Sequence, residues 1–121
     1  MSTKRFLALA TFALAGALTS SAFAHAKLQS SDPRAGSTLD SVPNQIRLKF
    51  NEALEPAFSR IRLSGPRGQD IPLGAATVDK ADTGVMTVPM PPLSAGDYRI
   101  RWSTMTRDGH KAKGEVPFKV R

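Results

Sequence analysis

The chain has 121 residues, a formal net charge of +7 and no cysteine. This length suits one domain rather than two, and the absence of cysteine excludes disulfides, thiolate metal ligands and cysteine nucleophiles. In a cytosolic protein the excess of positive charge would suggest nucleic acid as a partner. The amino-terminal residues indicate export, however, so we expect no nucleic-acid partner. Anionic surfaces of the cell envelope are then the simplest partner that the charge suggests.

The amino-terminal residues have the three-part pattern of a secretory signal peptide. Lys4 and Arg5 form a short basic region, residues 6–18 (FLALATFALAGAL) form an apolar run, and small residues follow. The apolar run is too short for a transmembrane helix, which needs about 20 apolar residues. No second apolar run of this kind follows it. We therefore predict a periplasmic mature chain without a membrane span.

Two cleavage sites fit the small-x-small pattern that ends a signal peptide. Cleavage after Ala24 makes His25 the first residue, whereas cleavage after Ala26 removes that histidine. Both bonds remain open from the sequence. We take the first, which gives a cleaved signal peptide at 1–24 and a mature domain at 25–121. Loss of the two basic residues of the leader leaves 15 basic against 10 acidic side chains.

Four segments of the mature domain alternate between apolar and polar residues, which is the pattern of half-buried β-strands. They are QIRLKF at 45–50, RIRLSG at 60–65, DYRIRWS at 97–103 and GEVPFKV at 114–120. The side chains expected to face the core are Ile46, Leu48, Phe50, Ile61, Leu63, Tyr98, Ile100, Trp102, Val116, Phe118 and Val120. We expect the arginines and lysines between them to be mainly the solvated faces of strands.

Turn residues separate these strands, and no segment has the pattern of a long amphipathic helix. NEALEPAF at 51–58 allows one helical turn before Pro56, and Pro117 favours an edge position or a bulge in the last strand. Short strands at this spacing in about 100 residues predict an all-β, single-domain sandwich of immunoglobulin-like type.

The two histidines of the chain suggest a metal site. If His25 is the first residue, its α-amine and its imidazole can bind the same ion, and nitrogen donors suit Cu(II), which favours tetragonal N and O ligands. Asp108 and His110 are two residues apart, so on an extended segment they project to the same side. Gly109 leaves room between them. Together these groups would supply three nitrogens and one oxygen.

Simpler interpretations also remain open from the residues alone. Asp-Gly is a common turn dipeptide, and His25 is equally explained as an accident of the cleavage region. The thioethers of Met86, Met90 and Met105 suit Cu(I), but these residues do not cluster, and methionine commonly fills protein cores. We interpret the three methionines as packing residues.

The mature sequence resembles the CopC-type periplasmic copper-binding proteins over essentially its whole length. The resemblance is carried by HAKLQSSDPRAGS at 25–37, IRLKFNEAL at 46–54 and YRIRWSTMTRDGHKAKGEVPFKV at 98–120. It is the combination of a mature amino-terminal histidine, a strand ending in F-x-E and a late D-G-H that is specific.

This resemblance implies a Greek-key β-sandwich that binds one Cu(II) per chain and takes part in copper resistance or supply. It implies that His25 provides its amine and imidazole and that Asp108 and His110 complete the site. Glu52 matches an acidic residue near the copper site of some members. Several members also carry a methionine-rich Cu(I) loop after the F-x-E strand, but residues 64–80 contain no methionine, so no second, Cu(I) site is predicted.

The function favoured by the sequence is a monomeric copper carrier or buffer without catalysis, which the resemblance places beside an inner-membrane copper transporter of the CopD type. One alternative is a histidine-brace copper oxidase similar to the lytic polysaccharide monooxygenases. Those enzymes present a broad aromatic face, whereas the one Trp and the one Tyr here are predicted to face inward. A second alternative is an immunoglobulin-like interaction module that binds no metal.

Overall fold

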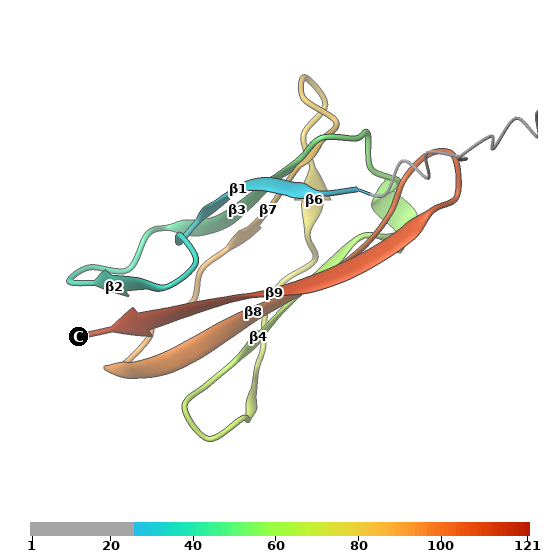
Figure 1. Cartoon of the computed structure of the whole chain (residues 1–121). Coiled ribbons are helices and arrows are strands. Elements are labelled where there is room, and N and C mark those ends of the chain that lie inside the picture. Colours follow the sequence, from blue (N-terminus) through green and yellow to red (C-terminus); the bar gives the residue numbers. More distant parts are fainter. Residues whose placement is uncertain (1–25) are drawn as a thin grey trace, which may run out of the picture.

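The computed structural model describes residues 26–121. The predicted signal peptide at 1–24 and His25 lie outside this part of the chain. The described residues form two β-sheets that pack face to face (Figure 1). One sheet has the strand order β1 (Leu28–Asp32), β3 (Gln45–Phe50), β7 (Val85–Pro89), β6 (Thr77–Val78). The other has the order β2 (Ser37–Leu39), β9 (Lys111–Val120), β8 (Gly96–Met105), β4 (Arg60–Ser64), β5 (Asp70–Ile71).

The chain passes repeatedly from one sheet to the other instead of completing either sheet first. The strand pairs are antiparallel except for β2 with β9, which is parallel. The predicted class, an all-β single-domain sandwich, is confirmed. No helix in residues 26–121 is long and apolar enough to cross a membrane.

The core lies between the sheets and is built by the alternation that the sequence shows. In β3, Ile46, Leu48 and Phe50 are buried, and the two residues between them, Arg47 and Lys49, are partly exposed. All eleven side chains predicted to face the core are buried. Phe50 of β3 meets Trp102 of β8 edge to face, with ring centroids 4.8 Å apart and planes at 71°. Such a pair stabilises the fold by about 0.5–1.5 kcal/mol beyond the contribution of its buried surface area. This pair joins the two sheets.

The longest pairing is the hairpin of β8 and β9. It runs without a break from Gly96 opposite Val120 to Met105 opposite Lys111. Pro117 causes no bulge there. Its carbonyl accepts a hydrogen bond from the Gly36 backbone N–H at 2.7 Å, on the side of β9 away from β8. Because N–H and C=O of one strand residue point the same way, the missing N–H of the proline lies on that side as well, where β2 begins to pair.

The segment after β3 differs from the sequence-based expectation in one detail. A single turn of 3-10 helix, η1 (Pro56–Phe58), starts at the proline instead of ending before it. Proline suits the first position of a helix because its missing N–H would have no partner there. The turn exposes Phe58, the one large apolar side chain of residues 26–121 that is exposed, at 58%.

The two ends of the sandwich carry different parts of the chain. Residue 28, where β1 starts, and the β8–β9 connection lie at one end, and the carboxyl terminus lies at the other (Figure 1). The last residue is fixed at that far end: the Arg121 backbone N–H donates to the Leu39 carbonyl at 2.9 Å, and the Arg121 guanidinium lies 3.5 Å from Asp40.

A close contact between β8 and β9 gives a stability prediction. A Cβ on Gly114 would lie 2.4 Å from Cζ2 of Trp102, its partner across the hairpin. We expect Gly114→Ala to destabilise the fold by about 1–3 kcal/mol, because the indole has to move within a packed core. The measurement is urea unfolding followed by far-UV circular dichroism.

Gly74→Ala is the matched control, because its Cβ would meet nothing within 4 Å. We expect that change to be neutral or to stabilise by up to about 1 kcal/mol, through the entropy of the unfolded chain. Equal midpoints for the two variants would contradict the packing argument.

Candidate metal centre

The connection between β8 and β9 brings together the two predicted ligands of the D-G-H motif. Nδ1 of His110 lies 3.0 Å from Oδ2 of Asp108. Gly109 has a φ of +92°, a conformation that favours glycine, and its backbone N–H donates to the Thr106 carbonyl at 2.9 Å. The turn interpretation and the ligand interpretation of Asp-Gly are therefore compatible, because the turn is what holds the two side chains on one side.

Thr106 organises this loop. It is buried, with 2% exposure, and its hydroxyl donates to Oδ1 of Asp108 and accepts from the His110 backbone N–H at 3.3 Å. The Thr106 backbone N–H also donates to the His110 carbonyl at 2.9 Å. One buried side chain thus fixes both residues of the motif. Sequence reasoning missed it, because its burial depends on tertiary packing.

These contacts set the ionisation of the Asp108 carboxyl. The hydroxyl of Thr106 is the largest influence holding the pKa of Asp108 below its usual range, and the backbone N–H and ring of His110 act in the same direction. A lowered pKa means that the folded loop favours the ionised form of Asp108. The ionised carboxylate therefore stabilises the fold at pH values above the ordinary pKa of aspartate, and this stabilisation is lost as the pH falls through the lowered pKa of the folded state. At neutral pH the loop presents an ionised oxygen donor beside an imidazole.

Residues 51–55 connect this loop to the start of the described chain. Asn51 is bonded to Lys27 in both directions: its side-chain Oδ1 accepts the Lys27 backbone N–H at 2.7 Å, and its own N–H donates to the Lys27 carbonyl at 3.1 Å. Further along, Leu54 forms an isolated β-bridge with Thr106. The Ala53 carbonyl also accepts the Arg107 N–H at 3.3 Å. One short segment therefore contacts both the amino-terminal strand and the β8–β9 loop.

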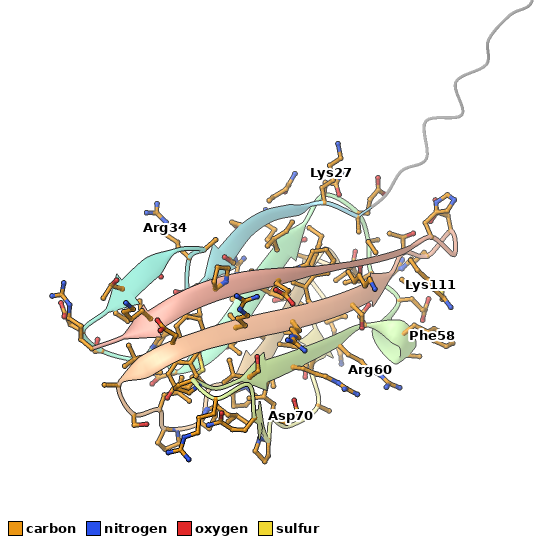
Figure 2. The ribbon with its side chains drawn as sticks, turned by 60° about the horizontal axis from the view of Figure 1, so that its bottom comes forward. Lys27, Arg34, Phe58, Arg60, Asp70 and Lys111 are labelled. Carbon is orange, nitrogen blue, oxygen red and sulfur yellow. The ribbon has the colours of Figure 1, made fainter. Side chains whose placement is uncertain are left out.

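The start of the described chain is also held by packing, because Ala26 is buried in the core. Its side chain is 4% exposed and belongs to the main apolar cluster. Lys27 and Lys111 accordingly lie toward one end of the sandwich (Figure 2). Asn51, like Thr106, was missed by sequence reasoning, since its contribution depends on a hydrogen bond between residues 24 positions apart.

The predicted ligands fall into three groups by position. Asp108 and His110 are in contact. Glu52 is half-buried between the two residues that bond to Lys27 and to Arg107, but within residues 26–121 no three histidine, aspartate or glutamate side chains gather as a metal-binding group. His25 lies outside the described residues. The described chain therefore supplies a pair of donors, and a complete site requires others.

The geometry of the pair suits a metal with ligands at right angles. Two ligand atoms that each lie about 2.0–2.1 Å from an ion are about 2.9 Å apart when they subtend 90°. Nδ1 of His110 and Oδ2 of Asp108 are 3.0 Å apart. The separation of the two atoms therefore matches that of neighbouring ligands in a tetragonal site.

The methionines are only partly as expected. Met86 is fully buried, and Met90 is half-buried against the core, as predicted for packing residues. Met105, however, lines a surface groove with Phe58 and Lys111 rather than packing in the core cluster.

Comparison with known proteins identifies the family to which this fold and this loop belong. The family model for the CopC domain matches residues 28–121. The chain belongs to the CopC family. Copper resistance protein C of Xanthomonas campestris pv. juglandis is 36% identical over 124 residues, which cover 97% of each chain. Copper transport protein CutJ of Bacillus subtilis is 32% identical over 104 residues, which cover 85% of this chain and 19% of CutJ.

Solved CopC-family structures have the same fold. CopC of Methylosinus trichosporium OB3b matches with a TM-score of 0.75 and 26% identity, over 79% of this chain and 93% of that one. PcoC of Escherichia coli, described as a methionine-rich copper resistance protein, matches with a TM-score of 0.66 and 34% identity, over 81% and 100%. This CopC-family chain, by contrast, has four methionines in all, one of them fully buried in the core.

The hydroxyl of Thr106 gives a prediction for the metal-free CopC domain. Thr106→Val keeps the shape of the side chain and removes the hydroxyl, so we expect the pKa of Asp108 to rise toward its ordinary range. Titration of the Asp108 carboxyl carbon by NMR measures this, with Asp79 as the internal control. The pKa of Asp79 is lowered mainly by the backbone N–H groups of Asp82 and Ala81, so it should not move. An unchanged Asp108 titration would show that Thr106 does not set its ionisation.

Proposed function

We propose that this protein binds one Cu(II) per chain and carries or buffers copper in the periplasm. The observation that supports this most is the pair of Asp108 and His110, held 3.0 Å apart by a loop that is tied to the amino-terminal strand through residues 51–55. Family membership adds to it, since relatives over the whole length are named copper resistance proteins. The donors, an imidazole and a carboxylate, supply the N and O ligands that Cu(II) favours in a tetragonal site.

The remaining donors that we propose are the α-amine and imidazole of His25, exposed by cleavage after Ala24. Ala26, the residue after His25, is buried in the core, and Lys27 is bonded to Asn51. An amino terminus at His25 would therefore begin one residue before an anchored position, at the end of the sandwich that carries the D-G-H loop. Glu52 is proposed as a neighbouring carboxylate that offsets part of the charge of the ion.

A carrier is favoured over an oxidase by the placement of the aromatic residues. Tyr98 and Trp102 are buried in the core, at 4% and 8% exposure, and Phe58 is the one exposed large apolar side chain of the described residues. Residues 26–121 thus lack the broad aromatic face on which a polysaccharide would stack.

Copper transfer to a membrane transporter is the proposed context. CutJ, named a copper transport protein, contains a region similar to this chain within a sequence about five times as long. The name of CutJ supports a copper transporter as the partner of a separate CopC domain, and we propose one of the inner-membrane, CopD type. We propose no second, Cu(I) site, because residues 64–80 contain no methionine and Met86 and Met90 pack in or against the core.

The amino-terminal chelate can be tested by adding one residue. Extending the mature chain by a Met before His25 moves the α-amine away from the imidazole, while both histidines and the net charge stay nearly unchanged. We expect the Cu(II) affinity to fall by at least about 100-fold, which is about 2.7 kcal/mol, with a changed electron paramagnetic resonance spectrum. Competition titration measures the affinity.

Two controls make that result interpretable. The intact mass of the exported native protein must correspond to a chain starting at His25, and a start at Lys27 would refute the proposed ligand set. Equal affinity and an identical spectrum for the native and extended chains would show that the amine is not a ligand.

The D-G-H pair is tested by removing one donor at a time. We expect His110→Ala to weaken Cu(II) binding by about 100-fold and Asp108→Asn by about 10-fold, because the amide keeps an oxygen but loses the negative charge. Asp70→Asn on β5 makes the same chemical change at an exposed position that has no ion pair in the described chain, and should leave the affinity unchanged. Wild-type affinity in both loop variants would exclude this loop as the site.

A further inference from the structure

The outer face of the five-stranded sheet carries the positive charge of the domain. Its three longest strands expose seven cations and two carboxylates. They are Arg60, Arg62, Arg99, Arg101, Lys111, Lys113 and Lys119, with Asp97 and Glu115. Residues 26–121 contain 15 basic and 10 acidic side chains. Asp70 of β5, opposite Ser64, adds a third carboxylate at the edge of this face. The eight basic and seven acidic residues elsewhere nearly balance, so four of the five excess positive charges lie on this face.

The cations of this face are not all neutralised locally. Glu115 pairs with Arg99 at 3.0 Å and with Arg101 at 3.3 Å. Asp97 lies 3.7 Å from Lys119. No ion pair within residues 26–121 includes the four remaining cations, which are Arg60, Arg62, Lys111 and Lys113.

These four cations lie toward the end of the face that carries the metal-centre loop. Strand register places Arg60 and Lys113 in one row, on either side of Ser103. With neighbouring strands about 4.8 Å apart, the two are about 10 Å from each other. Lys111 is the first residue of β9, two residues before Lys113 and directly after His110. The cations are thus spread over a surface instead of converging on a single ion.

An exposed aromatic side chain lies at the edge of the same cations. Phe58 of η1 and Met105 line a groove together with Arg60, Lys111 and Lys113. A neighbouring groove continues along the face through Arg60 and Lys113 to Arg62 and Arg101. In Figure 2, Phe58, Arg60 and Lys111 lie next to one another at the end of the sheet. An apolar ring in a field of cations is what the interface of an anionic membrane accommodates, since the ring enters the headgroup layer and the cations meet its charge.

We propose that this face, defined as Phe58 with Arg60, Arg62, Lys111 and Lys113, docks on the surface of an anionic phospholipid bilayer. We choose a bilayer as the partner because of charge complementarity. An anionic bilayer presents negative charge over a plane, which matches cations that are dispersed over a surface and form no ion pairs within residues 26–121. Docking would place the loop of Asp108 and His110 beside the bilayer. The interaction requires no metal and is independent of the proposed copper function.

The test is sedimentation of the metal-free mature protein with vesicles. We expect binding to phosphatidylethanolamine vesicles that contain phosphatidylglycerol and none to vesicles of phosphatidylcholine alone. Each removed cation should weaken binding about fivefold, so Lys111→Gln with Lys113→Gln should weaken it about 25-fold at low salt. In about 1 M salt, where screening acts over about 3 Å, that difference should disappear.

Two further variants separate the parts of the surface. Arg34→Gln with Lys80→Gln removes the same charge from exposed turn positions off this face, and should leave most of the binding intact. Phe58→Ser should weaken binding severalfold at every salt concentration, whereas Phe58→Trp should keep it and report insertion as a blue shift of fluorescence.

Three outcomes would overturn the proposal. They are absence of binding to the phosphatidylglycerol vesicles, equal loss in the two double variants, and binding to soluble polyglutamate without binding to vesicles. The last outcome would identify an acidic protein as the occupant of the face. None of them would bear on Cu(II) affinity, so failure here is distinguishable from failure of the copper proposal.

Discussion

The unbroken pairing of β8 with β9 is the constraint on which the rest of the molecule depends. Ten consecutive residue pairs keep the two strands in a single register, from Gly96 opposite Val120 to Met105 opposite Lys111. Because side chains alternate along a strand, a slip by one residue would exchange the buried and exposed sets of that strand. This register therefore directs Tyr98 and Trp102 into the core and leaves the basic residues outside. The turn that closes the hairpin is the one that carries the D-G-H motif.

The short segment after β3 adds backbone pairing between the two sheets at the end that carries the D-G-H loop. It leaves the four-stranded sheet at Asn51 and reaches the hairpin of the other sheet at Leu54, which bridges to Thr106. A change in how the sheets pack would consequently be transmitted to the loop of Asp108 and His110. The edge-to-face contact of Phe50 with Trp102, one residue before Asn51 in the chain, resists such a change. Core packing and donor geometry are thus coupled through very few residues.

The fold was largely predictable because its signal is local. Alternation in β3, β4, β8 and β9 correctly predicted eleven core residues. Pro117 was expected at an edge position or a bulge; it causes no bulge, and it lies just before the residues of β9 that pair with β2. The start of η1 was wrong by a turn, because proline both ends and begins helices and the local sequence did not decide between them. Met105 was misplaced because its packing depends on which strands lie beside β8.

The candidate site was predictable only where its residues are neighbours in the chain. Asp108 and His110 are two residues apart, so their proximity was predicted, although a turn at Gly109 and not an extended segment brings them into contact. Thr106 acts through its burial and Asn51 through a hydrogen bond across 24 positions of the chain, and no local pattern reveals either of them. The basic face has the same origin: alternation predicted that Arg62 and Arg101 point outward, but only the strand order brings them together. The predictions for His25 and the leader concern residues outside the described part of the chain.

The position of the carboxyl terminus makes the molecule suited to oriented attachment. Arg121 is fixed to Leu39 and Asp40 at the end of the sandwich opposite the β8–β9 loop (Figure 1). A linker, dye or carrier domain joined after residue 121 would project away from the donor pair and leave that end open to solution. Any group joined ahead of Ala26 would instead emerge next to it. If the protein were immobilised through its carboxyl end on a sensor chip or an electrode, all molecules would have the same orientation, with the D-G-H loop facing the solution.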